Sequence, residues 1–157
     1  MYIETMWFKK NRIDLKQLEQ LEQALNIKLP DFFLRFYSEE VKLINKFKKL
    51  SNDEDFIGLT TDFDWMIEYN RDFLQLPKTE GLCKHKICIG TDGCGNDSFI
   101  SLETKDTRVF KVDHEIADDL LDDSTDDFNW EDERMEKYDS LRHYLKEEIK
   151  VLKEFRS

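Results

Sequence analysis

Residues 87–115 carry the clearest pattern of the chain, because apolar and polar positions alternate there over three short runs. The runs are Ile87–Ile89, Ser98–Leu102 and Val109–Val112. Turn-forming Asp, Gly and Asn residues separate the first two runs, and Glu103–Thr107 separates the last two. Alternation with period 2, interrupted by turn formers, is typical of antiparallel strands. The pattern therefore predicts an antiparallel meander with one face on a core.

The first third of the chain has a helical pattern instead. Four leucines recur every three or four residues and predict a helix with one core-facing stripe: Leu15, Leu18, Leu21 and Leu25. Asp14 can cap this helix, and Asn26 suits the left-handed position that ends it. Pro30 and Asp31 are well placed to open a second helix. Its inward-facing aromatic residues are expected to be Phe33, Phe36 and Tyr37. Residues 38–47 fit neither period cleanly, and we favour a helix there.

Capping signals and a second helical stripe predict the remaining elements. Residues 56–59 are expected to form a short strand, and Thr61 with Asp64 to open a third helix. An acidic segment covers residues 115–133, and a C-terminal helix is expected over residues 131–155. The apolar stripe of that helix is Met135, Tyr138, Leu141, Leu145, Ile149 and Leu152. The sequence thus predicts an α+β fold, in which helices flank a mostly antiparallel central sheet with a meander.

Composition limits the class of protein. We expect the 157 residues to form a single domain, residues 1–157, with material for one core. A phosphate backbone would repel the net charge of −11, so we expect no direct nucleic-acid binding, whereas a basic protein partner fits. Acidity that only keeps the protein soluble is the alternative. We see no apolar run long enough for a signal peptide or a membrane span, and the three cysteines do not form a disulfide framework. We therefore expect a cytoplasmic protein that makes no membrane contact and is a monomer or a weak homodimer.

Two features of the meander could suggest catalysis. The glycine-rich stretch 90–95 leads into a strand rather than a helix, so a turn that needs positive φ explains it better than a phosphate-binding loop. A Cys–His or Asp–His pair can be assembled from Cys94, Asp113 and His114. No third orienting group accompanies such a pair, and neighbouring strand residues point to opposite faces. We therefore expect no catalytic residue.

Metal binding is also not expected. The soft metal ligands of this region are Cys83, His85, Cys88, Cys94 and His114. Structural zinc sites usually pair cysteines two to four residues apart, twice over, and these spacings do not match. Cys88 lies within a predicted strand, where a thiol is usually a small buried apolar group. The sequence predicts neither a metal nor another cofactor.

The acidic segment is a more specific candidate site. Its aspartates fall in pairs at four-residue spacing, and like charges at that spacing destabilise a helix, so the pattern gains nothing locally. The glycine and ligand spacing of a calcium loop are absent. Two interpretations stay open: a solvated loop, and a protein-binding surface with Phe128 or Trp130 as an apolar anchor. The predicted partner-binding residues are Asp118, Asp119, Asp122, Asp123, Asp126, Asp127, Trp130 and Asp132.

Four stretches of the chain, in this order and spacing, resemble the SMI1/KNR4 family of the SUKH superfamily, which comprises bacterial immunity proteins and fungal cell-wall regulators. The stretches are Leu18–Phe36 (LEQLEQALNIKLPDFFLRF), Ile57–Asn70, Ile89–Leu102 (IGTDGCGNDSFISL) and Val109–Glu115 (VFKVDHE). Two positions depart from the family pattern. Residues 37–40 replace an Asn-Gly-Gly turn, and Val112 replaces an aromatic residue.

The resemblance implies an α+β scaffold that binds proteins and has no catalytic residues. In bacteria the implied partner is a polymorphic toxin, often a nuclease. Since nucleases hold phosphates in basic clefts, an acidic protein suits such a partner. Our first hypothesis is a non-enzymatic immunity protein that binds a cognate toxin and occludes its active site. The alternatives are a regulatory scaffold of the cell-wall-assembly type that binds several proteins, and a small-ligand or metal-binding domain with a pocket near Cys88, Cys94 and His114.

Overall fold

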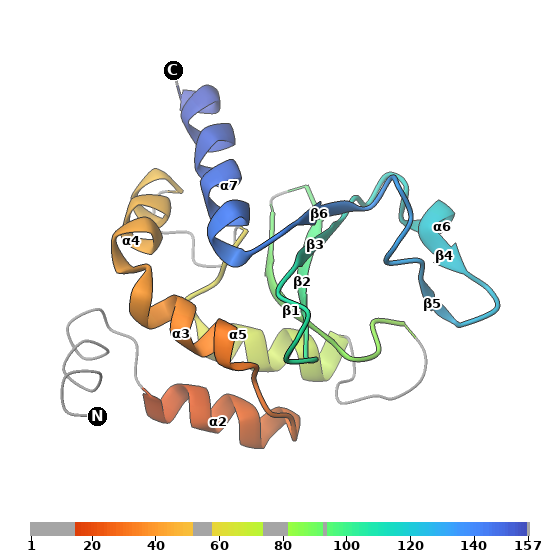
Figure 1. The fold of residues 1–157 in the computed structure, drawn as a ribbon, viewed down its shortest axis with the longest axis horizontal. Helices are drawn as coiled ribbons and strands as arrows, with labels where there is room; N and C mark the ends of the chain where they lie inside the picture. Colours follow the sequence, from red (N-terminus) through yellow and green to blue (C-terminus); the bar gives the residue numbers. More distant parts are fainter. Residues whose placement is uncertain (1–14, 52–57, 74–81, 93, 157) are drawn as a thin grey trace.

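The main sheet confirms the predicted α+β class. The residues that the computed structural model describes are 15–51, 58–73, 82–92 and 94–156. The strands of the sheet are β1 (Lys86–Thr91), β2 (Asp97–Ser101), β3 (Val109–Val112) and β6 (Glu136–Tyr138). They lie in the order β1-β2-β3-β6, and each neighbouring pair is antiparallel (Figure 1). The predicted meander is therefore present as β1 to β3, and a fourth strand extends it.

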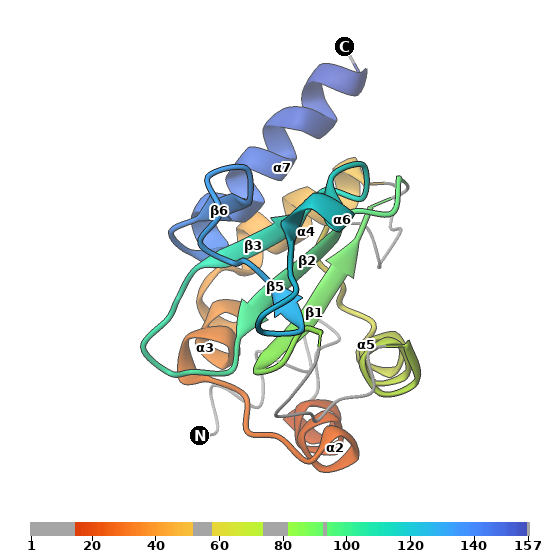
Figure 2. The same ribbon diagram turned by 90° about the vertical axis from the view of Figure 1, so that its right-hand side faces the viewer.

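Helices cover one face of this sheet (Figures 1 and 2). They are α2 (Leu15–Leu25), α3 (Asp31–Glu39), α4 (Val41–Leu50), α5 (Phe63–Glu68) and α7 (Leu141–Arg156). Asn26 follows α2 with a φ of 50°, as predicted, and Pro30 is the N-cap of α3. Asp14, the expected cap of α2, lies outside the described residues. The helix that we favoured after residue 38 is present as α4. Among the described helices, none has both the length and the apolar character needed to cross a membrane.

Helix α5 begins one residue later than its capping pattern predicts. The N-cap is Asp62 rather than Thr61, and its carboxylate accepts a hydrogen bond from the backbone N–H of Trp65 at 3.1 Å. The helix continues as a π-helix over Tyr69–Phe73, which brings the buried Asn70 against β1. The Asn70 amide accepts from the N–H of Cys88 at 2.8 Å and donates to its carbonyl at 2.9 Å. These two bonds fix the helix on the sheet.

The strand predicted at residues 56–59 is only partly visible, because residues 56 and 57 lie outside the described residues. Gly58 and Leu59 form a bend, and not a strand. They still run beside β1, since the N–H groups of Gly58 and Thr60 donate to the carbonyls of Thr91 and Ile89. Backbone hydrogen bonds therefore bring this segment to the sheet without extending it.

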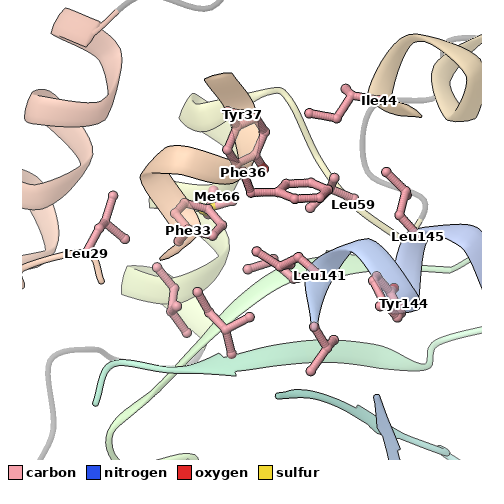
Figure 3. Close-up of a cluster of buried hydrophobic side chains, with 14 of the residues drawn as sticks. Leu29, Phe33, Phe36, Tyr37, Ile44, Leu59, Met66, Leu141, Tyr144 and Leu145 are labelled. Atoms are coloured by element: carbon pink, nitrogen blue, oxygen red, sulfur yellow. The ribbon is translucent and has the colours of Figure 1, made fainter. Parts of the chain in front are cut away.

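The main core lies between the helices and the sheet, and two buried tyrosines join its parts (Figure 3). The hydroxyl of Tyr37 donates to the carbonyl of Thr60 at 2.9 Å. The hydroxyl of Tyr144 donates to the carbonyl of Gly58 at 2.8 Å and lies 2.7 Å from the hydroxyl of Ser98. Among the described residues, no buried side-chain nitrogen or oxygen lacks a hydrogen-bond partner.

A second apolar cluster lies on the opposite face of the sheet, so the prediction of a single buried face is wrong. Successive strand residues point to opposite faces, and both sets are apolar here. The strand residues that face the main core are Ile87, Ile89, Ile100 and Val109. Those that face the second cluster are Cys88, Phe99, Phe110 and Val112. The chain after β3 covers this second set with Leu120, Phe128, Trp130 and Met135.

The C-terminal helix begins ten residues later than predicted, at Leu141 instead of residue 131. Residues 136–138 form strand β6 instead, in which Tyr138 pairs with Val109. Strand β3 would otherwise expose an unpaired edge, and pairing satisfies its backbone groups. Ser140 then accepts a hydrogen bond from the N–H of His143 at 3.1 Å and so stops fraying of the new helix.

Gly90 yields a stability prediction. A Cβ atom at this position would lie 2.2 Å from the carbonyl oxygen of Gly58, which is rigid backbone. We expect Gly90→Ala to lower the free energy of unfolding by more than ~3 kcal/mol, measured by urea denaturation. Gly95→Ala is the matched control, because Gly95 has a φ of +90° but open space, with His114 at 4.0 Å. In Gly95→Ala, backbone strain alone should lower the free energy of unfolding by about 1–2 kcal/mol. If both variants lose the same free energy of unfolding, the close contact between Gly90 and the backbone of Gly58 is contradicted.

Candidate acidic interface and its pocket

The acidic segment folds as a small unit on the second face of the sheet. It contains α6 (Ala117–Leu120) and a two-stranded hairpin of β4 (Leu121–Asp122) and β5 (Asp127–Phe128). Figure 1 shows this unit at the end of the molecule opposite α4, and Figure 2 shows it in front of the sheet. The segment therefore has regular structure and a fixed place.

Trp130 lies against the sheet rather than pointing into solvent. Its ring makes edge-to-face contacts with Phe99, Phe110 and Phe128, at centroid distances of 5.4, 5.3 and 5.5 Å. The ammonium of Lys86 lies 4.9 Å from the same ring, and burial lowers the pKa of this lysine. Such contacts stabilise the fold by about 0.5–1.5 kcal/mol per aromatic pair. Trp130 thus holds the segment in place, and its role as a partner anchor stays a prediction.

Asp127 is also turned inward, with 4% of its surface exposed. One carboxylate oxygen accepts hydrogen bonds from the backbone N–H of Cys83 and of Phe128, both at 2.8 Å. The other accepts from the indole N–H of Trp130 at 3.1 Å. Asp127 therefore links the acidic segment to the chain before β1 and fixes the orientation of the indole.

The remaining predicted aspartates lie at the surface or near it, and they fall into two groups. Asp118, Asp119, Asp123 and Asp126 are exposed. Asp122 and Asp132 are partly covered and bind residues two positions further along the chain. Asp122 accepts from the hydroxyl of Ser124 at 2.6 Å, which lowers its pKa. Asp132 binds the guanidinium of Arg134, and these hydrogen bonds lower its pKa to about 2. The first group is free to face a partner.

A pocket of about 170 Å³ opens beside this surface, between the segment and the sheet. Its lining residues are Leu82, Cys83, Gly95, Asp97, Phe99, Val112, His114, Ala117 and Phe128. Asp97 is fixed by the hydroxyl of Tyr69, which donates to it at 2.6 Å, and burial raises the pKa of Asp97. A pocket near Cys88, Cys94 and His114 is expected from the sequence only if the protein is a small-ligand or metal-binding domain. Of these three residues, His114 alone lines the pocket.

The glycine-rich turn and His114 have structural roles. The carboxylate of Asp92 accepts from the N–H groups of Cys94 and Asn96 at 2.9 and 3.0 Å. Asn96 in turn accepts from the N–H of His114 at 2.9 Å and lies 2.8 Å from its Nδ1 atom. His114 and Asp113 lie 3.9 Å apart, too far for a hydrogen bond. Gly95 has the expected positive φ, and Gly93 lies outside the described residues.

The cysteines do not assemble a metal site among the described residues, where no three His, Cys, Asp or Glu side chains cluster suitably. Cys83 and Cys88 are buried, and Cys94 is exposed. Burial raises the pKa of the Cys88 thiol, which favours its protonated form. Cys88 therefore packs as a small apolar side chain, as the sequence indicated.

The sequence matches one known protein family over most of its length. A model of the SMI1/KNR4 family (SUKH-1) matches residues 12–147, which is most of the chain. The chain belongs to the SMI1/KNR4 family. No curated protein and no solved structure matched it. Membership makes it an immunity- or regulator-type protein in general terms. The four resembling stretches all lie within the matched residues.

In this SMI1/KNR4 protein, sequence reasoning missed the second apolar cluster and the inward position of Asp127. In the sequence, the second cluster is marked by four apolar residues among or just after the aspartates: Leu120, Phe128, Trp130 and Met135. The spacing of these four residues matches neither the period of a helix nor that of a strand. No local pattern could therefore show that these four side chains share one face.

The internal position of Asp127 can be tested directly. In Asp127→Asn, one carboxylate oxygen becomes an NH2 group, so at least one of the three N–H donors loses its acceptor. We expect the free energy of unfolding to fall by about 1–3 kcal/mol in chemical denaturation. Asp126→Asn at the exposed neighbouring position should change it by less than about 0.5 kcal/mol. A similarly small effect at residue 127 would show that this carboxylate does not hold the segment.

Proposed function

We propose that this SMI1/KNR4 protein is a non-enzymatic, cytoplasmic immunity protein that binds a cognate toxin and occludes its active site. The supporting observation is an acidic surface that is fixed to the sheet by buried apolar side chains of the same segment. Residues 115–133 contain ten acidic residues and no Lys or Arg. Most of their apolar side chains pack on the sheet, Leu121 being exposed, and four aspartates are exposed. Such a surface fits a basic protein, and a nuclease is the class of toxin that we propose.

Nuclease chemistry supports this class of partner. An enzyme that binds a nucleic acid must present positive charge to the phosphates. A protein that places fixed carboxylates over that charge competes with the substrate for the same groups. Because the acidic segment is already folded on the sheet, little conformational entropy is lost when it binds. Pre-organisation of this kind favours tight association.

The opposite end of the molecule adds a steering effect. Helix α4 carries Lys42, Lys46, Lys48 and Lys49 and no acidic residue. Figure 1 places α4 far from α6, so positive and negative charge are separated along the molecule. A basic partner is therefore attracted to one end and repelled from the other. This separation orients the encounter before contact is made.

Charge reversal tests the surface. The variant replaces the four exposed aspartates with lysine: Asp118, Asp119, Asp123 and Asp126. We expect its association rate constant with the toxin-like domain of the neighbouring gene product to fall about tenfold or more at low salt. The salt dependence of the rate should flatten. Surface plasmon resonance at several ionic strengths measures both.

A matched control carries four other exposed acidic residues changed to lysine: Glu19, Glu39, Glu68 and Glu154. Both variants change the net charge equally, so only the position of the charge differs. If the two variants associate equally fast, the acidic segment is not the interface. If co-expression pull-down of the wild-type chain recovers no neighbouring toxin, the immunity proposal fails, and the regulatory scaffold takes its place.

A further inference from the structure

The pocket beside the acidic segment is lined by both apolar and polar side chains. Six lining residues present apolar or thiol side chains: Leu82, Cys83, Phe99, Val112, Ala117 and Phe128. Asp97 and His114 are the polar side chains of the lining, and no Lys or Arg belongs to it. Leu82 is 36% exposed, a high value for a leucine next to an apolar pocket. The lining of the pocket is thus mostly apolar, with one carboxylate and one imidazole among its side chains.

Its size fits a side chain. The volume of about 170 Å³ is several times that of one water molecule, about 30 Å³ in the liquid. A cavity of about 150 Å³ with apolar walls holds a benzene ring. Water inside an apolar recess makes few hydrogen bonds, so an apolar side chain that displaces it gains free energy.

The charges of residues near the pocket indicate which residues of a partner could flank the inserted side chain. Ala117 and Phe128 belong to the acidic segment itself, so the exposed Asp118 and Asp126 lie one or two positions away in the chain. Glu115 is exposed between His114 and Ala117. Asp97 presents a further carboxylate from the lining. An apolar group with acidic neighbours would be repelled here, whereas one flanked by Lys or Arg would be attracted.

We propose that this pocket receives an apolar side chain of the protein partner, carried on a segment in which Lys or Arg flank it. The inference rests on the proposed function and adds to it the anchor of the interface, a central apolar group within an acidic ring. This arrangement matches known interface hot spots, in which a buried anchor is surrounded by polar contacts that exclude water. The anchor pocket, rather than Trp130, is then the apolar centre of the surface.

Short peptides test the pocket without the toxin. The full chain, labelled with 15N, is titrated with capped Arg-Arg-Leu-Arg-Arg, Arg-Arg-Ala-Arg-Arg and Glu-Glu-Leu-Glu-Glu. We expect the leucine-arginine peptide to shift the amide signals of Gly95, Val112 and Ala117. Its dissociation constant should be at least about tenfold lower than that of the alanine peptide. The glutamate peptide should not bind. Equal binding of the two arginine peptides, or binding of the glutamate peptide, would overturn the inference.

The two alanines of the chain provide a matched pair of variants. Ala117→Leu fills the pocket and should remove the preference for the leucine peptide. Ala24→Leu, at an exposed site on α2, should keep it. If Ala117→Leu does not fold, as judged by circular dichroism, Leu82→Asn removes part of the apolar rim at an exposed position. That variant should also lose the preference, and an unchanged preference would contradict the pocket.

The neighbouring toxin-like protein separates this inference from the proposed function. If it binds the wild-type chain and loses affinity with the four-lysine variant but not with Ala117→Leu, the acidic surface stands and the anchor pocket is wrong. If the peptides behave as expected while the toxin-like protein does not bind, the anchor pocket stands and the immunity proposal is wrong.

Discussion

Burial of the sheet on both faces is the constraint on which the rest of this structure depends. Strands β1 to β3 carry large apolar side chains on each side, and neither set can be left in water. Full burial of one such side chain contributes about 1.5–3 kcal/mol, whereas like charges at i,i+4 cost only a few tenths. Packing of Leu120, Phe128, Trp130 and Met135 therefore outweighs the repulsion among the aspartates. The acidic segment is held in place for that reason.

Polar groups inside the fold set the relative positions of its parts. Asn70 joins α5 to β1, and Tyr144 joins α7 to the bend at Gly58. Lys111 and the buried Glu148 join β3 to α7 through an ion pair of 3.0 Å. Because an unpaired buried polar group is costly, alternative arrangements of the same apolar surfaces are disfavoured. Asn70, which lies in one of the stretches that resemble the family, belongs to this internal network. Its role is therefore to hold the scaffold together.

The same division explains how the molecule can serve as a binding protein. Asp127 and Trp130 face the sheet, while Asp118, Asp119, Asp123 and Asp126 face solvent from the same short segment. The inward residues give the segment its shape, and the outward ones give it its charge. The pocket lies where these two sets meet, because Ala117 and Phe128 contribute to it from the segment and Phe99 and Val112 from the sheet. Under the proposed function, recognition of a basic partner would depend on the same packing that stabilises the fold.

The sequence by itself determined the parts with short-range signals. Alternation predicted β1 to β3, leucine spacing predicted α2, and Asn26 and Pro30 predicted its end and the start of α3, because these features depend on neighbours a few residues apart. Only the tertiary structure decided three others: the strand at 136–138 in place of the predicted helix, the second buried face, and the inward turn of Asp127. Strand β6 forms because β3 offers an unpaired edge, and Asp127 is buried because Cys83, 44 residues earlier, offers it an N–H group. Such partners are distant in the chain, so no local pattern contains them.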